Sequence, residues 1–331
     1  MNLFRKLPID GYSILLLATV ALAAAMPAQG GAASALAYLT TGAITLLFFL
    51  HGARLSRQAV IAGATHWRLH LLVFSCTFIL FPILGLGMSA AFGRFLDPML
   101  MTGIVFLTLL PSTVQSSIAF TAMAGGNVTA AVCSAAASNL AGTLLTPVLV
   151  ALFLGIQGHE GDILPVVRTI ALQLLVPFAA GQLLQPRLGG WIGKHRALVT
   201  ATDRGAILLV VYTAFSAAIV EGLFTRIAPS DLWLTLQLCV LLLALILGIS
   251  HFAASALGFS RPDRIAILFC GSKKSLASGV PIATALFPVA TVGYVILPLM
   301  IFHQIQLLVC AFLAGRMRQH SEIEPATTLQ A

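Results

Sequence analysis

The chain has 331 residues, of which 59% are hydrophobic and 8% charged, and its formal net charge is +8. Because about a quarter of the residues of a soluble domain are charged, this composition excludes a soluble globular protein. Apolar runs recur along the whole length, and the mean hydropathy is +1.00. The sequence therefore predicts an all-α polytopic membrane protein surrounded by lipid.

Ten apolar stretches are long enough to cross a bilayer. They lie near residues 11–28, 34–52, 69–91, 98–123, 127–155, 163–186, 205–223, 232–258, 265–286 and 291–315. The first resembles a signal peptide. We interpret it as a membrane helix, because counting it as a span places most Lys and Arg residues on the cytoplasmic side. We expect one transmembrane domain over 1–331, with a flexible cytoplasmic tail at 320–331.

The positive residues predict the orientation. If both termini are cytoplasmic, most Lys and Arg residues between the spans also fall on the cytoplasmic side, and only Arg94 and Arg226 lie in loops on the other side. Most of the net charge thus belongs to membrane topology, and it predicts no nucleic-acid partner.

Ten spans divide into two sets of five, approximately 11–155 and 163–315, and the second set must run with inverted topology. The fourth span contains "LLPSTVQSSIAFT" (109–121) and the ninth contains "FCGSKKSLASGVP" (269–281). Pro111 removes a backbone hydrogen bond and Gly271 weakens the ninth helix. Paired breaks in corresponding spans indicate a substrate site at the membrane midplane.

Polar side chains in these spans and their neighbours are the candidates for substrate or ion binding. They are Gln115, Ser116 and Ser117 in the fourth span, Ser134, Ser138 and Asn139 in the fifth, Ser275 in the ninth, and His303 and Gln304 in the tenth. The alternative for each hydroxyl or amide is a bond between helices. His303 is either a buried, hydrogen-bonded histidine or part of a proton relay.

Two adjacent lysines, Lys273 and Lys274, lie near the middle of the ninth span. A lysine there costs about 2.5–3.5 kcal/mol on insertion scales. One interpretation is structural, in which the ammonium groups bind carbonyls freed by the helix break. The other is functional, in which they hold an anionic substrate or replace a bound cation.

No enzyme motif accompanies these residues. The chain has no HExxH, no GxSxG with triad partners and no Walker A motif, and no Asp or Glu lies near the centre of a predicted span. The five cysteines lie in apolar segments without metal-ligand spacing. We therefore expect neither an enzyme nor a cofactor, apart from a sodium ion considered next.

Five segments resemble the bile acid:sodium symporter family, most closely its YfeH-like bacterial branch, which is related to an orphan animal member. They are 39–56, 111–147, 203–222, 269–281 and 297–314, with the motifs "PSTVQSSIAFTAMAGGNVTAAV" and "FCGSKKSLASGVP". The resemblance implies ten helices in two inverted repeats, a core and a panel domain, and unwound, crossing helices four and nine. It also implies a multi-pass protein of the bacterial inner membrane.

The resemblance carries over unevenly to the sodium ligands. Ser116 and Ser117 fall where sodium-coupled members have a Ser-Asn pair, so a possible Na⁺ would lie near them and Asn139. Ala131 and Ala135 stand in place of hydroxyl ligands, and Thr77 falls near a glutamine. Phe269 and Lys273 replace a Glu and a Gln, which predicts lost or altered sodium sites.

These observations predict a secondary active transporter of a small organic anion, working by alternating access, in which Lys273 or Lys274 replaces a coupling cation. The alternative is a regulatory membrane protein that keeps the fold without transporting. The sequence predicts no oligomeric state.

Overall fold

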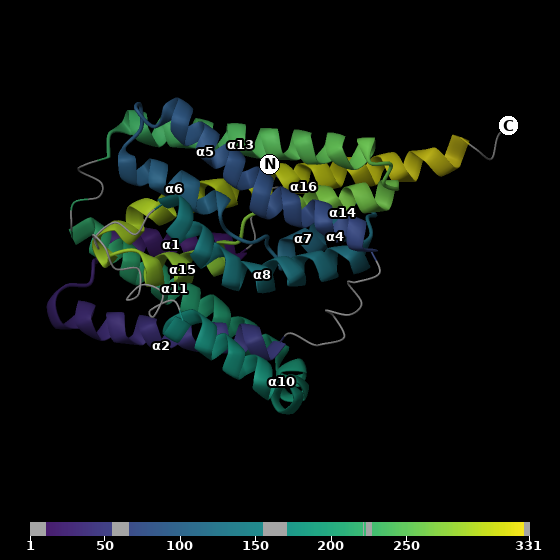
Figure 1. Cartoon of the computed structure of the whole chain (residues 1–331). Coiled ribbons are helices and arrows are strands. Elements are labelled where there is room, and N and C mark those ends of the chain that lie inside the picture. Colours follow the sequence, from purple (N-terminus) through teal and green to yellow (C-terminus); the bar gives the residue numbers. More distant parts are fainter. Residues whose placement is uncertain (1–10, 55–65, 155–170, 221, 223–226, 328–331) are drawn as a thin grey trace, which may run out of the picture.

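The computed structural model describes residues 11–54, 66–154, 171–220, 222 and 227–327, and within these ranges it contains helices and no strand. The elements are α1 (Gly11–Ala25), α2 (Gly30–Arg54), α4 (Trp67–Ser75), η3 (Cys76–Leu80), α5 (Phe81–Phe92), α6 (Pro98–Thr108), α7 (Gln115–Met123), α8 (Val128–Leu154), η4 (Ala171–Leu175), α10 (Val176–Lys194), α11 (Arg196–Val220), α13 (Pro229–Ala256), α14 (Arg261–Gly271), α15 (Leu276–Leu286) and α16 (Val289–Thr327) (Figure 1). The protein is therefore all-helical in its described part, as the composition predicts.

Seven stretches of the described chain are long and apolar enough to cross a membrane. They are Gly30–Arg54, Trp67–Phe92, Val128–Leu154, Arg196–Val220, Pro229–Ala256, Arg261–Leu286 and Val289–Arg318. The protein is thus a multi-pass membrane protein. The predicted sixth span, 163–186, begins outside the described residues.

Local sequence features mark the start of α6 and the turn between α7 and α8. The Asp97 carboxylate accepts hydrogen bonds from the backbone N–H groups of Met99 and Leu100, at 2.8 and 3.2 Å, and so caps α6. Between α7 and α8 the chain turns at Gly125, whose φ of 71° favours glycine.

Both predicted helix breaks are present. The chain leaves helical geometry between α6 and α7, around Pro111, and again between α14 and α15, around Lys273. The Ser112 hydroxyl donates to the carbonyl of Cys270 at 2.6 Å. Because the two breaks lie against each other, each satisfies backbone groups that the other leaves exposed.

Two helix ends differ from the expectation. α11 begins at Arg196, nine residues before the predicted start at 205, so Asp203 and Arg204 lie within the helix and not in a loop. α16 runs to Thr327, past the start of the expected tail at 320. Glu322 and Glu324 are strong helix formers, so polarity alone did not end this helix.

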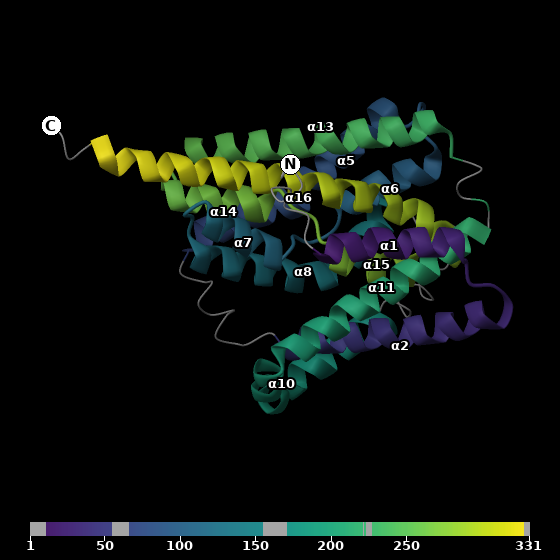
Figure 2. The same cartoon turned by 180° about the vertical axis from the view of Figure 1, so that it is seen from behind.

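The helices form two groups. The small bundle is α1, α2, α10 and α11, in which α2 packs on α10 and α11, and α1 packs on α11. The large bundle contains α4–α8 and α13–α16. Figure 1 shows α2 and α10 on the opposite side of the molecule from α13. Figure 2, from behind, shows α11 passing between α2 and α15.

Candidate functional site

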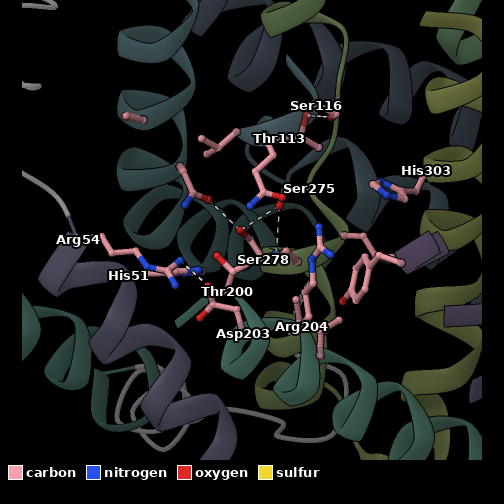
Figure 3. Close-up of a pocket in the computed structure, with 18 of the residues that line it drawn as sticks. His51, Arg54, Thr113, Ser116, Thr200, Asp203, Arg204, Ser275, Ser278 and His303 are labelled. Carbon is pink, nitrogen blue, oxygen red and sulfur yellow. Dashed lines mark hydrogen bonds and ion pairs between the residues drawn. The ribbon is translucent and has the colours of Figure 1, made fainter. Parts of the chain in front are cut away.

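A cavity of about 600 Å³ lies between the two bundles (Figure 3). The small bundle contributes Tyr12, His51, Arg54, Phe178, Thr200, Asp203, Arg204 and Ile207. The large bundle contributes the residues 113–116, Ala119, Phe120, Ala136, Asn139, Leu140, the residues 275–278, His303 and Leu307. The cavity is therefore built by both bundles and by both helix breaks.

The two helices that follow the breaks start at this cavity. Gln115, the first residue of α7, and Leu276, the first residue of α15, both line it. Ser275 caps α15 by accepting a hydrogen bond from the Ser278 backbone N–H at 3.1 Å. Because the N-terminus of a helix carries partial positive charge, both half-helices favour a negative group in the cavity.

Charged side chains of the small bundle face these helix ends (Figure 3). Arg54 of α2 forms an ion pair with Asp203 of α11. The Arg204 guanidinium lies over the ring of Tyr12, 5.0 Å from its centroid. Sequence reasoning assigned the arginines to topology because they lie at the edges of predicted spans. The position of these arginines in the sequence, just outside the apolar runs, did not indicate that they line a cavity.

Five of the predicted site residues line the cavity: Gln115, Ser116, Asn139, Ser275 and His303. They come from α7, α8, α16 and the second break, so segments distant in sequence meet here. The Asn139 side-chain oxygen accepts a hydrogen bond from the Ser278 hydroxyl at 2.8 Å. Ser278, which the sequence analysis did not select, thus positions the amide of Asn139.

Other predicted residues make contacts within the large bundle instead. Ser117 donates to the carbonyl of Phe269 at 3.0 Å, and the Ser138 hydroxyl accepts from the Ser112 N–H at 3.1 Å. The Ser134 hydroxyl lies 2.7 Å from Nδ1 of His70. These hydroxyls join neighbouring segments of the large bundle, which is the alternative that the sequence analysis gave for them.

Lys274 is fully buried, and its ammonium donates three hydrogen bonds to backbone carbonyls. The acceptors are Thr77, Thr108 and Leu110, at 2.8, 2.8 and 2.6 Å. An ammonium has three donors, so each finds a partner. Thr108 is the last residue of α6 and Leu110 follows it, where the break frees carbonyls. Thr77 lies in the π-helical turn η3.

Gln306 of α16 holds the backbone of the second break. Its Oε1 accepts from the Lys274 N–H and its Nε2 donates to the Lys274 carbonyl, both at 2.9 Å. Nε2 also lies 2.9 Å from Nδ1 of His303, which reaches the cavity. The predicted Gln304 does not line the cavity, and its Nε2 is buried without a hydrogen-bond partner among the described residues.

Lys273 is equally buried but has different surroundings. Its Nζ has no hydrogen-bond partner among the described residues. It lies over the ring of Phe120, 3.8 Å from the centroid, and 5.8 Å from that of Phe269. The two lysines, which lie in the break and not on a helix, therefore have separate environments.

With this geometry described, comparisons with known proteins identify the family. The model of the SBF-like CPA transporter family matches residues 10–319. The chain belongs to this family of transporters. It is 53% identical to an uncharacterized protein of Pseudomonas aeruginosa over 99% of the chain and 98% of that protein. It is 50% identical to "Putative symporter YfeH" of Escherichia coli K12, over 97% of the chain and 96% of that protein.

More distant relatives bear the name of the wider bile acid:sodium symporter family. The chain is 26% identical to sodium/bile acid cotransporter 7-A of Xenopus laevis, over 92% of the chain and 90% of that protein. The predicted resemblance is thereby confirmed. A transporter of this family takes a small-molecule substrate.

The residues expected to lie near a sodium ion in this SBF-like transporter already have hydrogen-bond partners. Ser116 and Ser117 hydroxyls lie 2.8 and 3.0 Å from that of Thr113, whereas the Asn139 oxygen already accepts from Ser278. The carbonyls of Thr77, Thr108 and Leu110 are taken by the Lys274 ammonium. In the described part of the chain, no group of three His, Cys, Asp or Glu residues forms a metal site.

Proposed function

We propose that this family member is a secondary active transporter that moves a small organic anion across the bacterial inner membrane by alternating access. The observation that carries the proposal is the meeting of two half-helix N-termini with Arg54 and Arg204 in one cavity. Positive helix ends at a discontinuous pair of helices are how several transporter folds bind anionic groups.

The proposal includes ten membrane helices in two inverted repeats, with both termini cytoplasmic. Its support is the position of the two breaks, one in each half of the chain, around Pro111 and Lys273. Movement of the small bundle against the large one would open the cavity to either side of the membrane, because residues of both bundles form its walls.

The cation that couples sodium-dependent relatives is replaced here by a tethered ammonium. Lys274 brings a positive charge to three carbonyl oxygens, which are the hard ligands that a bare cation would use. A sodium ion placed there would meet a like charge within a few ångströms. Transport by this chain is therefore independent of sodium.

The transport proposal is tested with purified protein in proteoliposomes. Radiolabelled acetate, benzoate, succinate and cholate are offered to vesicles loaded with the same unlabelled anion. Exchange of at least one anion above protein-free vesicles is expected. Binding of an anion without any exchange would instead favour the regulatory alternative.

The sodium proposal uses the same vesicles. Exchange rates are compared in sodium and potassium media of equal ionic strength, and equal rates are expected. A steep rise with sodium in the wild type, unchanged in Lys273→Gln and Lys274→Gln proteins, would contradict a tethered cation.

A further inference from the structure

The two buried lysines differ in what satisfies their ammonium groups. The Lys274 Nζ has three carbonyl acceptors, one for each N–H of an ammonium, so its hydrogen bonds favour the charged form. Around the Lys273 Nζ, the described residues provide two aromatic rings and no hydrogen-bond acceptor. A ring face attracts a cation but accepts no full hydrogen bond, so these surroundings hold the charge of Lys273 only weakly.

Few groups that could neutralise Lys273 lie near it. The titratable groups that face it are the thiols of Cys270 on α14 and Cys310 on α16. Of the other helices packed on α14, α7 carries no titratable residue, α4 carries Arg68 and His70, α8 carries Cys133, and α13 carries Asp231, Cys239 and His251. The charged residues of α14 itself, Arg261, Asp263 and Arg264, lie in its first turn, at the end away from Lys273. Lys274 is the next residue of the chain and carries the adjacent positive charge. Among the described residues, no carboxylate forms an ion pair or hydrogen bond with Lys273.

The aromatic ring that covers the Lys273 ammonium also lines the cavity. Phe120 lines the cavity, and the same ring lies 3.8 Å from the Lys273 Nζ. Phe120 is only partly buried and belongs to α7, the short half-helix that starts at the first break. A change in this ring's rotamer would bring water, or a negative group in the cavity, to the amine.

We propose that Lys273 is a proton-binding site and that the proton is the coupling ion of this transporter. An unpaired buried charge is unfavourable, so the amine is neutral while the cavity holds no anion. When an anion enters, the lone pair of the amine takes up one proton from water and the resulting ammonium faces the negative group. On the other side the ammonium returns the proton to water as the anion leaves. One proton thus accompanies each anion.

This inference rests on the proposed transport function, but its first test does not require a substrate. The chain has four lysines, Lys6, Lys194, Lys273 and Lys274, so selectively labelled lysine gives few signals in a nuclear magnetic resonance spectrum. The full chain in nanodiscs is titrated from about pH 5 to about pH 9, the range in which a coupling group must change charge. Lys273→Met and Lys274→Arg variants assign the two buried signals.

The Lys273 signal is expected to move between its amine and ammonium positions within that range, and the Lys274 signal to remain that of an ammonium. A Lys273 signal that stays at the ammonium position throughout overturns the proposal. If Lys273→Met does not fold, Lys273→Arg removes the same signal and serves for assignment.

The second test separates this inference from the transport proposal. Vesicles containing a pH-sensitive dye receive each anion of the panel, and both anion uptake and internal acidification are recorded. A proton site is supported if uptake is accompanied by acidification and if the rate of acidification falls at least tenfold in Lys273→Arg. Anion uptake without acidification overturns the proton site alone, and absence of uptake for every anion overturns the transport proposal instead.

A Phe120 variant allows a third measurement, of proton leak, which would not change if Lys273 had only a structural role. In a Phe120→Leu variant the ring no longer covers the amine, so proton movement is expected without an added anion. A leak of protons through Phe120→Leu that is absent from the Phe120→Leu, Lys273→Met double variant supports the proposal, and an equal leak through both contradicts it.

Discussion

The backbone N–H of Ser275 donates a hydrogen bond of 2.9 Å to the carbonyl of Pro111, and so joins the two helix breaks directly. The residues are 164 positions apart, and each lies in a segment that has left helical geometry. In a membrane such segments are stable only when buried in protein or beside water. The breaks therefore support each other, and the cavity forms where they meet.

Gly142 of α8 allows Pro111 to approach, and a methyl group there should separate them. A Cβ on Gly142 would lie 2.6 Å from the Pro111 Cγ. Gly142→Ala is expected to destabilise the protein by about 1–3 kcal/mol, because the rigid ring cannot move aside. Gly87→Ala, where nothing lies within 4 Å, is the control. Unfolding midpoints in detergent that fall equally for both would show that the close contact is unimportant.

Lys274 should contribute far more to stability than its neighbour. Lys274→Met leaves three buried carbonyls without a partner, and a lost bond to a charged group costs about 1.5–3 kcal/mol. We expect a loss of at least about 3 kcal/mol, or failure to fold. Lys273→Met removes only ring contacts and should unfold within about 1 kcal/mol of the wild type. Thermal unfolding of the two variants side by side measures the difference, and equal midpoints would contradict it.

Gln306 and Gln304 form a matched pair on α16. Gln306→Leu removes two hydrogen bonds to the Lys274 backbone, leaving buried polar groups unpaired at about 1–3 kcal/mol each. Gln304→Leu removes an amide nitrogen that has no hydrogen-bond partner in the described residues, so stability should stay the same or rise. The order of the unfolding midpoints tests this, and a lower midpoint for Gln304→Leu would reverse it.

The Arg54–Asp203 ion pair should tune anion affinity more than stability. Both side chains are partly exposed, so the pair itself contributes about 0–1 kcal/mol. Asp203→Asn leaves Arg54 unpaired and should tighten binding of an anion several-fold, whereas Arg54→Gln should weaken it similarly. The measurement is the KM for exchange of whichever anion the vesicles transport.

Arg316→Gln is the control for this charge effect. Arg316 lies over the ring of Phe312 and does not line the cavity, so its removal changes net charge by the same amount elsewhere. If Arg316→Gln alters KM as strongly as Arg54→Gln, the effect belongs to overall charge and not to the cavity.

Much of the fold could be predicted because hydropathy is a strong signal at membrane depth. Runs such as 232–258 need no partner to be recognised, and Pro111 indicated a break from its missing N–H alone. Helix ends were less predictable. Residues 196–204 lie before the predicted seventh span, yet they form the start of α11, because a helix can extend past the bilayer.

The candidate site was predicted in part. Gln115, Asn139 and Ser275 were selected for polarity in an apolar span, and they do line one cavity. Arg54, Asp203 and Arg204 were missed because charges at span ends are ordinary in any membrane protein. Only the packing of α2 and α11 against the breaks gives them a second role.

The sequence by itself determined that this chain crosses a membrane as helices, that two of them are interrupted, and that two charges lie inside one interruption. Composition and covalent geometry suffice for those conclusions, since each depends on a residue and its immediate neighbours. Only the tertiary structure distinguished the lysines. Lys274 meets three carbonyls from two other segments, whereas Lys273 meets aromatic rings. Which atoms surround a buried charge depends on contacts between segments up to 197 residues apart, and no local pattern encodes them.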